Sequence, residues 1–163
     1  MRGNRFCTGK ENHMSGILFV CSHNKGKSRM AEGLLRSRAP HIPVESAGTD
    51  VSPNERGVNE EAREALAEVG ARMDGDPLQL TASLADSYDL IVVVGQADIS
   101  DLVPQESTVE RWDVDEPSER GITGMKRMRM LREEIAERVD ELIDRWNEEH
   151  PEFDPATELK DKF

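Results

Sequence analysis

The segment 17–32, ILFVCSHNKGKSRMAE, constrains the fold of this chain more than any other part of its sequence. Its apolar start, residues 17–21, predicts a short buried strand, and a polar loop over 22–27 follows. We expect Ser28 to cap a helix that continues through Leu35. A loop between a strand and a helix N-terminus can turn successive backbone N–H groups inward. The segment therefore predicts a concave site suited to phosphate or a related oxyanion.

A cysteine opens this loop. Cys21 would lie among the loop amides and beside two lysines, which favours a nucleophilic thiolate. His23 could tune that thiolate, but we favour an exposed side chain. The alternative is a buried cysteine at a strand end without a chemical role. The candidate phosphate-binding residues are those of the loop and the first helical turn: Ser22, His23, Asn24, Lys25, Gly26, Lys27 and Ser28.

The rest of the chain alternates predicted strands and helices. Further strands are expected over 42–47, 90–94 and 108–112, helices over 54–69 and 121–149, and a short helical piece over 99–103. Gly70 would stop the first of these helices, with Val69 on its buried side. The segment 90–94 is apolar on both faces, as a central parallel strand requires.

The last predicted helix carries one apolar stripe. Its members recur at spacings of three and four: Met128, Leu131, Ile135, Val139, Leu142 and Trp146. Strands that alternate with such helices predict an α/β fold, a single domain with a four-stranded parallel twisted sheet and helices on both faces. In such folds ligands bind at the carboxyl ends of the strands.

Length and composition bound the organisation. At 163 residues the chain is long enough for one domain. We expect residues 16–149 to form it, 1–15 to be a disordered extension or tag, and 150–163 to be a loose C-terminal tail. Met14 is a candidate natural start.

The charge pattern excludes some partners. A formal net charge of −12 makes non-specific binding to nucleic acid or to an anionic membrane surface unfavourable. The sequence has no apolar run long enough to span a membrane and no signal-peptide pattern. Its two cysteines, Cys7 and Cys21, cannot form a disulfide framework for a domain of this size. We therefore expect a cytoplasmic protein.

Several motifs in order resemble one known family. Cys21-x5-Lys27-Ser28 followed by Met-Ala-Glu is similar to the signature of the low-molecular-weight protein tyrosine phosphatases and their arsenate reductase relatives. That signature is a cysteine, five residues, an arginine and Ser or Thr, then a Met-Ala-Glu helix. The resemblance continues in Ser46-Ala47-Gly48-Thr49 and in Glu116-Pro117, where the family has Asp-Pro. It covers roughly residues 16–147.

The resemblance implies a phosphatase fold and a two-step hydrolysis without metal or other cofactor. Cys21 would attack phosphorus, and an acid would protonate the leaving oxygen. Asn24 would shape the loop, Ser46 would brace it, and Ser28 would donate to the thiolate. The substrate would be a phosphorylated small molecule or a phosphoprotein, and the protein a monomer or weak dimer.

The sequence departs from the family at the cation and the acid. Lys27 stands where the family has arginine, and lysine lacks the planar fork that binds two oxygens. Arg29 could substitute, although we expect it to start the helix. Glu116 is the leading candidate for the acid and Asp115 the second, with Asp113 beside them.

The aromatic wall of the family is also missing. Ser118 and Glu119 stand where the family has tyrosines. Trp112 could replace them against a phosphotyrosine ring, but we favour a packing role for it. A preference for phosphotyrosine is therefore doubtful from the sequence.

Three alternatives to a phosphatase stay open. Lys27 could leave a phosphate- or phosphoprotein-binding module with little turnover. Arsenate reduction would need an external thiol, because Cys7 is the only other cysteine. Gly26-Lys27-Ser28 also matches the end of a nucleotide-binding G-x4-G-K-S loop, although Cys21 occupies the position of its first glycine.

Overall fold

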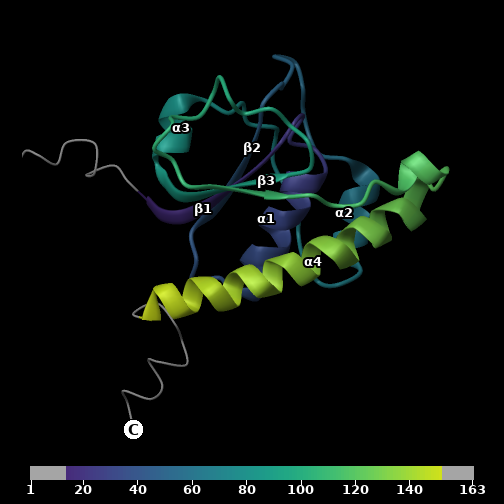
Figure 1. The fold of residues 1–163 in the computed structure, drawn as a ribbon. Coiled ribbons are helices and arrows are strands. Elements are labelled where there is room, and N and C mark those ends of the chain that lie inside the picture. The colour runs from purple at the N-terminus through teal and green to yellow at the C-terminus, as the bar shows by residue number, and fades with distance from the viewer. Residues whose placement is uncertain (1–13, 152–163) are drawn as a thin grey trace, which may run out of the picture.

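The computed structural model of the chain describes residues 14–151, in which strands and helices alternate (Figure 1). The elements are β1 (Met14–Cys21), α1 (Lys27–Arg38), β2 (Val44–Gly48), α2 (Glu60–Ala67), α3 (Ala82–Asp86), β3 (Tyr88–Val94), β4 (Val109–Trp112), the 3-10 helix η3 (Pro117–Arg120) and α4 (Gly124–Glu149). Most of the predicted extension and tail lies outside the described residues. However, β1 begins at Met14, inside the segment predicted as an extension.

The sheet is four-stranded and parallel, in the order β2-β1-β3-β4. This confirms the predicted fold class. Strands β1 and β3 are central, and their residues 17–20 and 91–93 are fully buried because both faces of the sheet are covered. Since all four strands run the same way, their carboxyl ends meet at one edge.

Helices cover both faces of the sheet. In Figure 1, α1, α2 and α4 lie on one side of the strands and α3 on the other. The larger core lies between the sheet and the helices α1, α2 and α4. It includes the whole predicted stripe of α4, from Met128 to Trp146. The smaller core joins Leu18 and Val20 of β1 to Ala85 of α3. Although α4 has 26 residues, no helix within residues 14–151 is long and apolar enough to cross a membrane.

The segment 54–59 is a loop, and the prediction of a helix there is wrong. Helix α2 starts at Glu60 because the Asn59 side chain caps it, with Oδ1 accepting a hydrogen bond from Ala62 N at 2.9 Å. The helix also ends earlier than predicted, and Val69 is 43% exposed instead of buried. The 54–59 loop is thereby free to lie beside the cysteine loop.

Smaller differences concern the second half of the chain. Residues 99–103 form one hydrogen-bonded turn closed onto the Ile99 carbonyl instead of a helix. Helix α4 begins at Gly124, three residues later than predicted, because Gly121 ends η3 in a left-handed conformation (φ 81°) and Thr123 is extended. Neither α3 nor η3 was predicted. Both are too short to show a helical period.

The segment after α2 approaches α1 closely at Gly33. A Cβ atom there would lie 2.4 Å from the Arg72 carbonyl oxygen and 2.7 Å from Leu66 Cδ2. The backbone can come this near only because glycine has no side chain. The contact fixes the position of α1 and, with it, the loop that α1 closes.

We predict that Gly33→Ala destabilises the protein by about 1–3 kcal/mol, as overpacking does. Helix propensity alone favours the alanine by about 1 kcal/mol, so the sign of the change tests the close approach. Urea unfolding would measure it. Ser37→Ala, at an exposed position of the same helix, is the control and should be neutral or slightly stabilising. A stabilising Gly33→Ala would contradict the packing described.

Candidate functional site

The loop between β1 and α1 turns its carbonyl oxygens outward. These oxygens accept hydrogen bonds from the exit of β2, from the cap of α2 and from α1: Thr49 N to Cys21 O at 2.9 Å, Asp50 N to Ser22 O at 2.8 Å, Asn59 N to Lys25 O at 2.8 Å and Met30 N to Gly26 O at 2.8 Å. In a planar trans peptide the N–H group points opposite to the C=O group. The N–H groups that follow these carbonyls therefore face the inside of the loop, which makes an anion-binding concavity.

Asn24 ties the loop to its surroundings. It is 1% exposed and has a φ of 56°, a left-handed conformation that asparagine tolerates better than most residues. Its Nδ2 donates to Ser28 Oγ at 2.9 Å and to Ser46 Oγ at 3.0 Å. Its Oδ1 accepts from Leu78 N at 2.9 Å. The structure thus places Asn24 and Ser46 where the resemblance put a shaping and a bracing residue.

Cys21 Sγ lies 2.9 Å from Ser28 Oγ. Because Ser28 Oγ already accepts from Asn24, its hydroxyl hydrogen is available to donate to the sulfur. Ser28 is fully buried inside α1, which begins at Lys27 after Gly26 without a side-chain cap. The prediction that Ser28 caps this helix is therefore wrong. The buried hydroxyl also argues against the nucleotide interpretation, in which this serine would hold magnesium.

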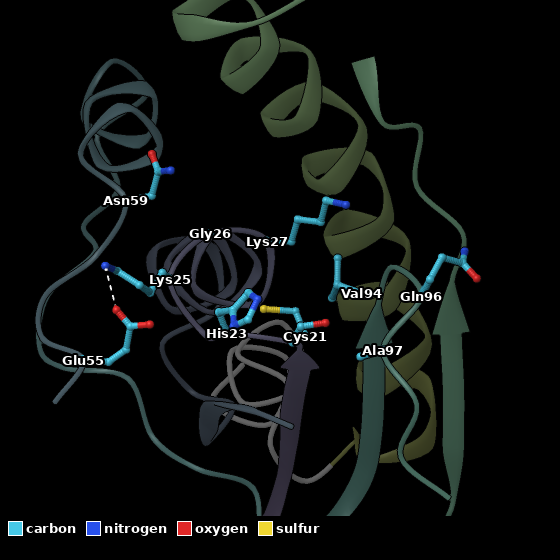
Figure 2. A pocket seen from close by; sticks show the side chains of 11 residues that line it. Cys21, His23, Lys25, Gly26, Lys27, Glu55, Asn59, Val94, Gln96 and Ala97 are labelled. Atoms are coloured by element: carbon cyan, nitrogen blue, oxygen red, sulfur yellow. Dashed lines mark hydrogen bonds and ion pairs between the residues drawn. The ribbon is translucent and has the colours of Figure 1, made fainter. Parts of the chain in front are cut away.

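A cavity of about 530 Å³ opens in front of Cys21 (Figure 2). It is lined by Cys21, Ser22, His23, Lys25, Gly26, Lys27, Glu55, Asn59, Val94, Gln96 and Ala97. Its described lining therefore contains no Phe, Tyr or Trp. His23 is exposed, as favoured, and its Nδ1 lies 3.0 Å from the Asp50 carbonyl oxygen.

The two lysines of the loop are engaged by carboxylates. Lys25 Nζ lies 3.2 Å from Glu55 Oε2, and Lys27 Nζ lies 3.1 Å from Glu116 Oε1. Figure 2 shows the two lysine side chains pointing to opposite sides, away from Cys21. The positive potential at the sulfur therefore comes mainly from the backbone amides.

Arg29 does not take the place of Lys27. Its side chain is buried on the far side of the loop, where it donates to the carbonyl oxygens of Asn24 and Asp74 and lies 3.9 Å from Glu32 Oε1. It belongs to the first turns of α1, as expected. The guanidinium braces the loop from behind instead of closing it over the anion.

All three candidate acids lie at the predicted edge of the sheet. Asp113, Asp115 and Glu116 line a second cavity of about 620 Å³. It shares four lining residues with the first: Ser22, Lys27, Gln96 and Ala97. The loops that leave β1, β3 and β4 therefore meet at the second cavity, and the loop that leaves β2 lines the first through Glu55 and Asn59. Asp113 Oδ1 accepts a hydrogen bond from Gln96 Nε2 at 2.8 Å.

The leading acid candidate is held in its charged form. Arg127 donates to Glu116 through Nε at 2.7 Å and through a terminal nitrogen at 2.8 Å. These bonds, with weaker help from Ser118 and Lys27, hold the pKa of Glu116 far below its usual range. Arg120 pairs with Asp115 at 2.7 Å and lowers the pKa of that carboxyl. This geometry argues against Glu116 as a proton donor.

Trp112 belongs to the core. It is 3% exposed, its ring lies 5.4 Å from that of Phe19, and its Nε1 donates to Glu110 at 2.7 Å. The favoured packing role is confirmed, and Trp112 forms no aromatic wall in the cavity. Within the described range 14–151, no group of three or more His, Cys, Asp or Glu is placed to hold a metal ion.

The sequence reasoning missed several residues of this site: Glu55, Asn59, Gln96 and Arg127. Asn59 could have been found, because it precedes two glutamates and an apolar run as a helix cap does. Arg127 could not, since no local pattern connects it to Glu116. Both arrive at the site through tertiary packing.

Comparisons with known proteins give two kinds of relative. A family described as low molecular weight phosphotyrosine protein phosphatase matches residues 16–152. Glutaredoxin arsenate reductase of Synechocystis is 30% identical over 137 residues, which cover 80% of this chain and 97% of that protein. The arsenate reductase structure from Archaeoglobus fulgidus is 32% identical with a TM-score of 0.65, and covers 78% of this chain and 98% of that one. A low molecular weight phosphotyrosine phosphatase from Vibrio cholerae, 24% identical with a TM-score of 0.73 over 84% and 99% of the chains, shares the fold.

We predict that Asn24→Ala lowers the free energy of unfolding by about 2–4 kcal/mol, because buried hydrogen-bonding groups lose their partner. Asn24→Gly should be less harmful, by up to about 1 kcal/mol, since glycine adopts the left-handed conformation without strain. Urea unfolding and calorimetric titration with phosphate would measure stability and binding. Asn54→Gly, at an exposed loop position, is the control. Wild-type stability of Asn24→Gly would show that the side-chain bonds contribute nothing.

Proposed function

Because the chain belongs to the low molecular weight phosphotyrosine protein phosphatase family, we propose that it hydrolyses phosphomonoesters through a phosphoryl group carried on Cys21. One observation carries this proposal. The Cys21 sulfur stands at the entrance of a loop with inward-facing amides and 2.9 Å from a buried hydroxyl. That arrangement suits a thiolate nucleophile and a tetrahedral oxyanion at the same place.

In the first step, the thiolate attacks phosphorus and the bond to the leaving oxygen breaks, so that the electron pair stays on that oxygen. The loop amides stabilise the charge on the equatorial oxygens. In the second step, water attacks the cysteinyl phosphate. The S–P bond breaks, its electron pair returns to Cys21, and the Ser28 hydroxyl stabilises the thiolate that leaves. The proton of the water passes to solvent.

The cavity supports a phosphorylated small molecule or a phosphorylated side chain of a protein as the substrate. Its volume of about 530 Å³ is within the range of small-molecule sites. Val94 and Ala97 offer apolar contact on one wall, while Lys25 paired with Glu55 makes the other polar. A substrate would bind there by its phosphate first, with the rest of the molecule held weakly.

Arsenate reduction with an external thiol is the second candidate. It is favoured by the Synechocystis relative, an arsenate reductase matched over nearly its whole length, and by Cys21 being the free cysteine in the described part of the chain. Cys21 would displace an oxygen of arsenate to form an S–As bond. An external thiol would attack the Cys21 sulfur, making a mixed disulfide, and the S–As electron pair would reduce arsenic to arsenite. A second thiol would restore Cys21.

We predict slow hydrolysis of p-nitrophenyl phosphate that Cys21→Ser reduces by about 10³-fold or more, because the nucleophile is lost. Lys27→Arg should raise kcat/KM by roughly 10-fold, since a guanidinium binds two oxygens of the phosphoryl group. Lys126→Arg, at an exposed position of α4, is the matched control and should change nothing. Phosphate binding without any turnover would instead favour the binding module.

For the second candidate, arsenate with glutathione and glutaredoxin should yield arsenite only if Cys21 is present. The measurement is arsenite production, with p-nitrophenyl phosphate hydrolysis followed in parallel. Arsenite formation above the rate of the Cys21→Ser variant would support reduction. Hydrolysis without arsenite would contradict it and favour the phosphatase.

A further inference from the structure

The Glu116 carboxylate accepts hydrogen bonds and ion pairs from residues of three elements around the site. Arg127 of α4 contacts both of its oxygens, at 2.7 and 2.8 Å, and Lys27 of α1 contacts Oε1 at 3.1 Å. Ser118 of η3 donates to Oε2 through its backbone N–H at 3.1 Å and through its hydroxyl at 2.7 Å. Protonation of this carboxyl would have to weaken most of these contacts together.

The other charged groups around Glu116 and Arg127 do not disrupt the ion pair between them. Five further carboxylates face it: Asp113, Asp115, Glu119 and Glu134 in the cavity that Glu116 lines, and Glu61 of α2 near Arg127. Asp115 is paired with Arg120, and Glu134 accepts a hydrogen bond from Asp115 N and lies 3.6 Å from Arg138. The Arg127 contact is bidentate, the strongest geometry for a carboxylate pair.

We propose that Arg127 is a positioning residue that keeps Glu116 as an anionic partner of Lys27, and so restricts the site to substrates whose leaving oxygen departs without a proton from the protein. This inference rests on the proposed phosphatase activity. It assigns a role to a side chain of α4 that is remote from the loop in sequence.

The restriction defines a substrate class. When the P–O bond breaks, the electron pair remains on the leaving oxygen. An acidic phenol or the carboxylate of an acyl phosphate is stable as that anion near neutral pH. An alkoxide is not, and needs a general acid, whose contribution is commonly about 10²–10⁴-fold. Phosphates of acidic phenols and acyl phosphates should therefore react, and alkyl phosphates should not.

The charged Glu116 carboxylate also affects Lys27. Its side chain passes over Gly95, whose Cβ position would lie 3.6 Å from Nζ, and ends at Glu116. An arriving oxyanion must compete with Glu116 for this ammonium group. Removing the carboxylate charge should therefore improve oxyanion binding, as a separate effect from proton donation.

The test compares kcat/KM for p-nitrophenyl phosphate, phenyl phosphate and glycerol phosphate in wild type and Arg127→Met. Wild type should show a steep loss from the first substrate to the last. Arg127→Met should narrow the gap between p-nitrophenyl and phenyl phosphate by about 10–100-fold, because Glu116 can then donate a proton. For phenyl phosphate, the activity of the variant should fall as pH rises through the new pKa of Glu116, a limb absent from wild type.

Three further variants separate positioning from structure. Arg127→Lys keeps a charge but loses the bidentate contact, so its substrate ratio should fall between those of wild type and Arg127→Met, while Arg127→Met with Glu116→Gln should lose the gain. Arg129→Met removes an arginine of the same helix that pairs with Glu68, away from the site, and should leave the substrate ratio unchanged. An unchanged ratio in Arg127→Met, or an equal loss for all substrates in a protein that still unfolds cooperatively, would overturn the proposal.

NMR titration of the Glu116 carboxyl keeps the test independent of turnover. The wild-type signal should titrate only well below the usual range of a glutamate carboxyl, because the pKa of Glu116 is lowered mainly by Arg127, whereas the Arg127→Met signal should titrate at higher pH. If no substrate is turned over in a Cys21-dependent way but this difference is seen, the proposed function fails, while the role of Arg127 in keeping Glu116 charged is supported. If Glu116 titrates alike in both proteins, Arg127 does not keep Glu116 charged and the proposal is wrong.

Discussion

The outward orientation of the loop carbonyl oxygens of Cys21, Ser22, Lys25 and Gly26 is the constraint on which the site depends. A thiol at the end of a buried strand would otherwise be an ordinary core residue. Here the exit of β2 and the Asn59 cap of α2 hold these carbonyls from outside, and Asn24 fixes the turn from within. Three segments distant in sequence thus cooperate to aim amides at one sulfur. The anion site is a property of the packed domain and not of the loop alone.

The positive side chains of this structure are largely compensated by carboxylates. The net charge of the chain is −12, and within residues 14–151 most Lys and Arg side chains form an ion pair with a carboxylate, including those of the site. Lys25 pairs with Glu55, and Lys27 with Glu116. The backbone N–H groups supply a fixed positive potential, because the fold holds them in place. A lysine side chain, in contrast, can turn toward a carboxylate. Side-chain cations then set how easily a ligand enters.

Much of the fold could be predicted because its signals are local. The apolar runs of β1 and β3 and the stripe of α4 depend on burial, which has a clear period in the sequence. The sheet edge that gathers the Cys21 loop and the 113–116 loop followed from parallel topology. The start of α2 and the presence of η3 could not be predicted by period, because caps and tertiary contacts decide them. Ser28 shows the same limit, since a hydroxyl expected at a helix cap is used by a sulfur instead.

The central pairing of the sheet has a consequence for how the molecule forms. Strand β1 pairs with β3, so that Leu18 lies beside Ile91, while two helical crossovers separate them in the chain. Such non-local pairing makes folding slow, because the loop-closure entropy is lost before the contacts form. A nascent chain that has emerged only as far as α2 has the cysteine motif but lacks β3, the central strand that pairs with β1. Reactivity at that sulfur would therefore arise late, as a marker of finished assembly.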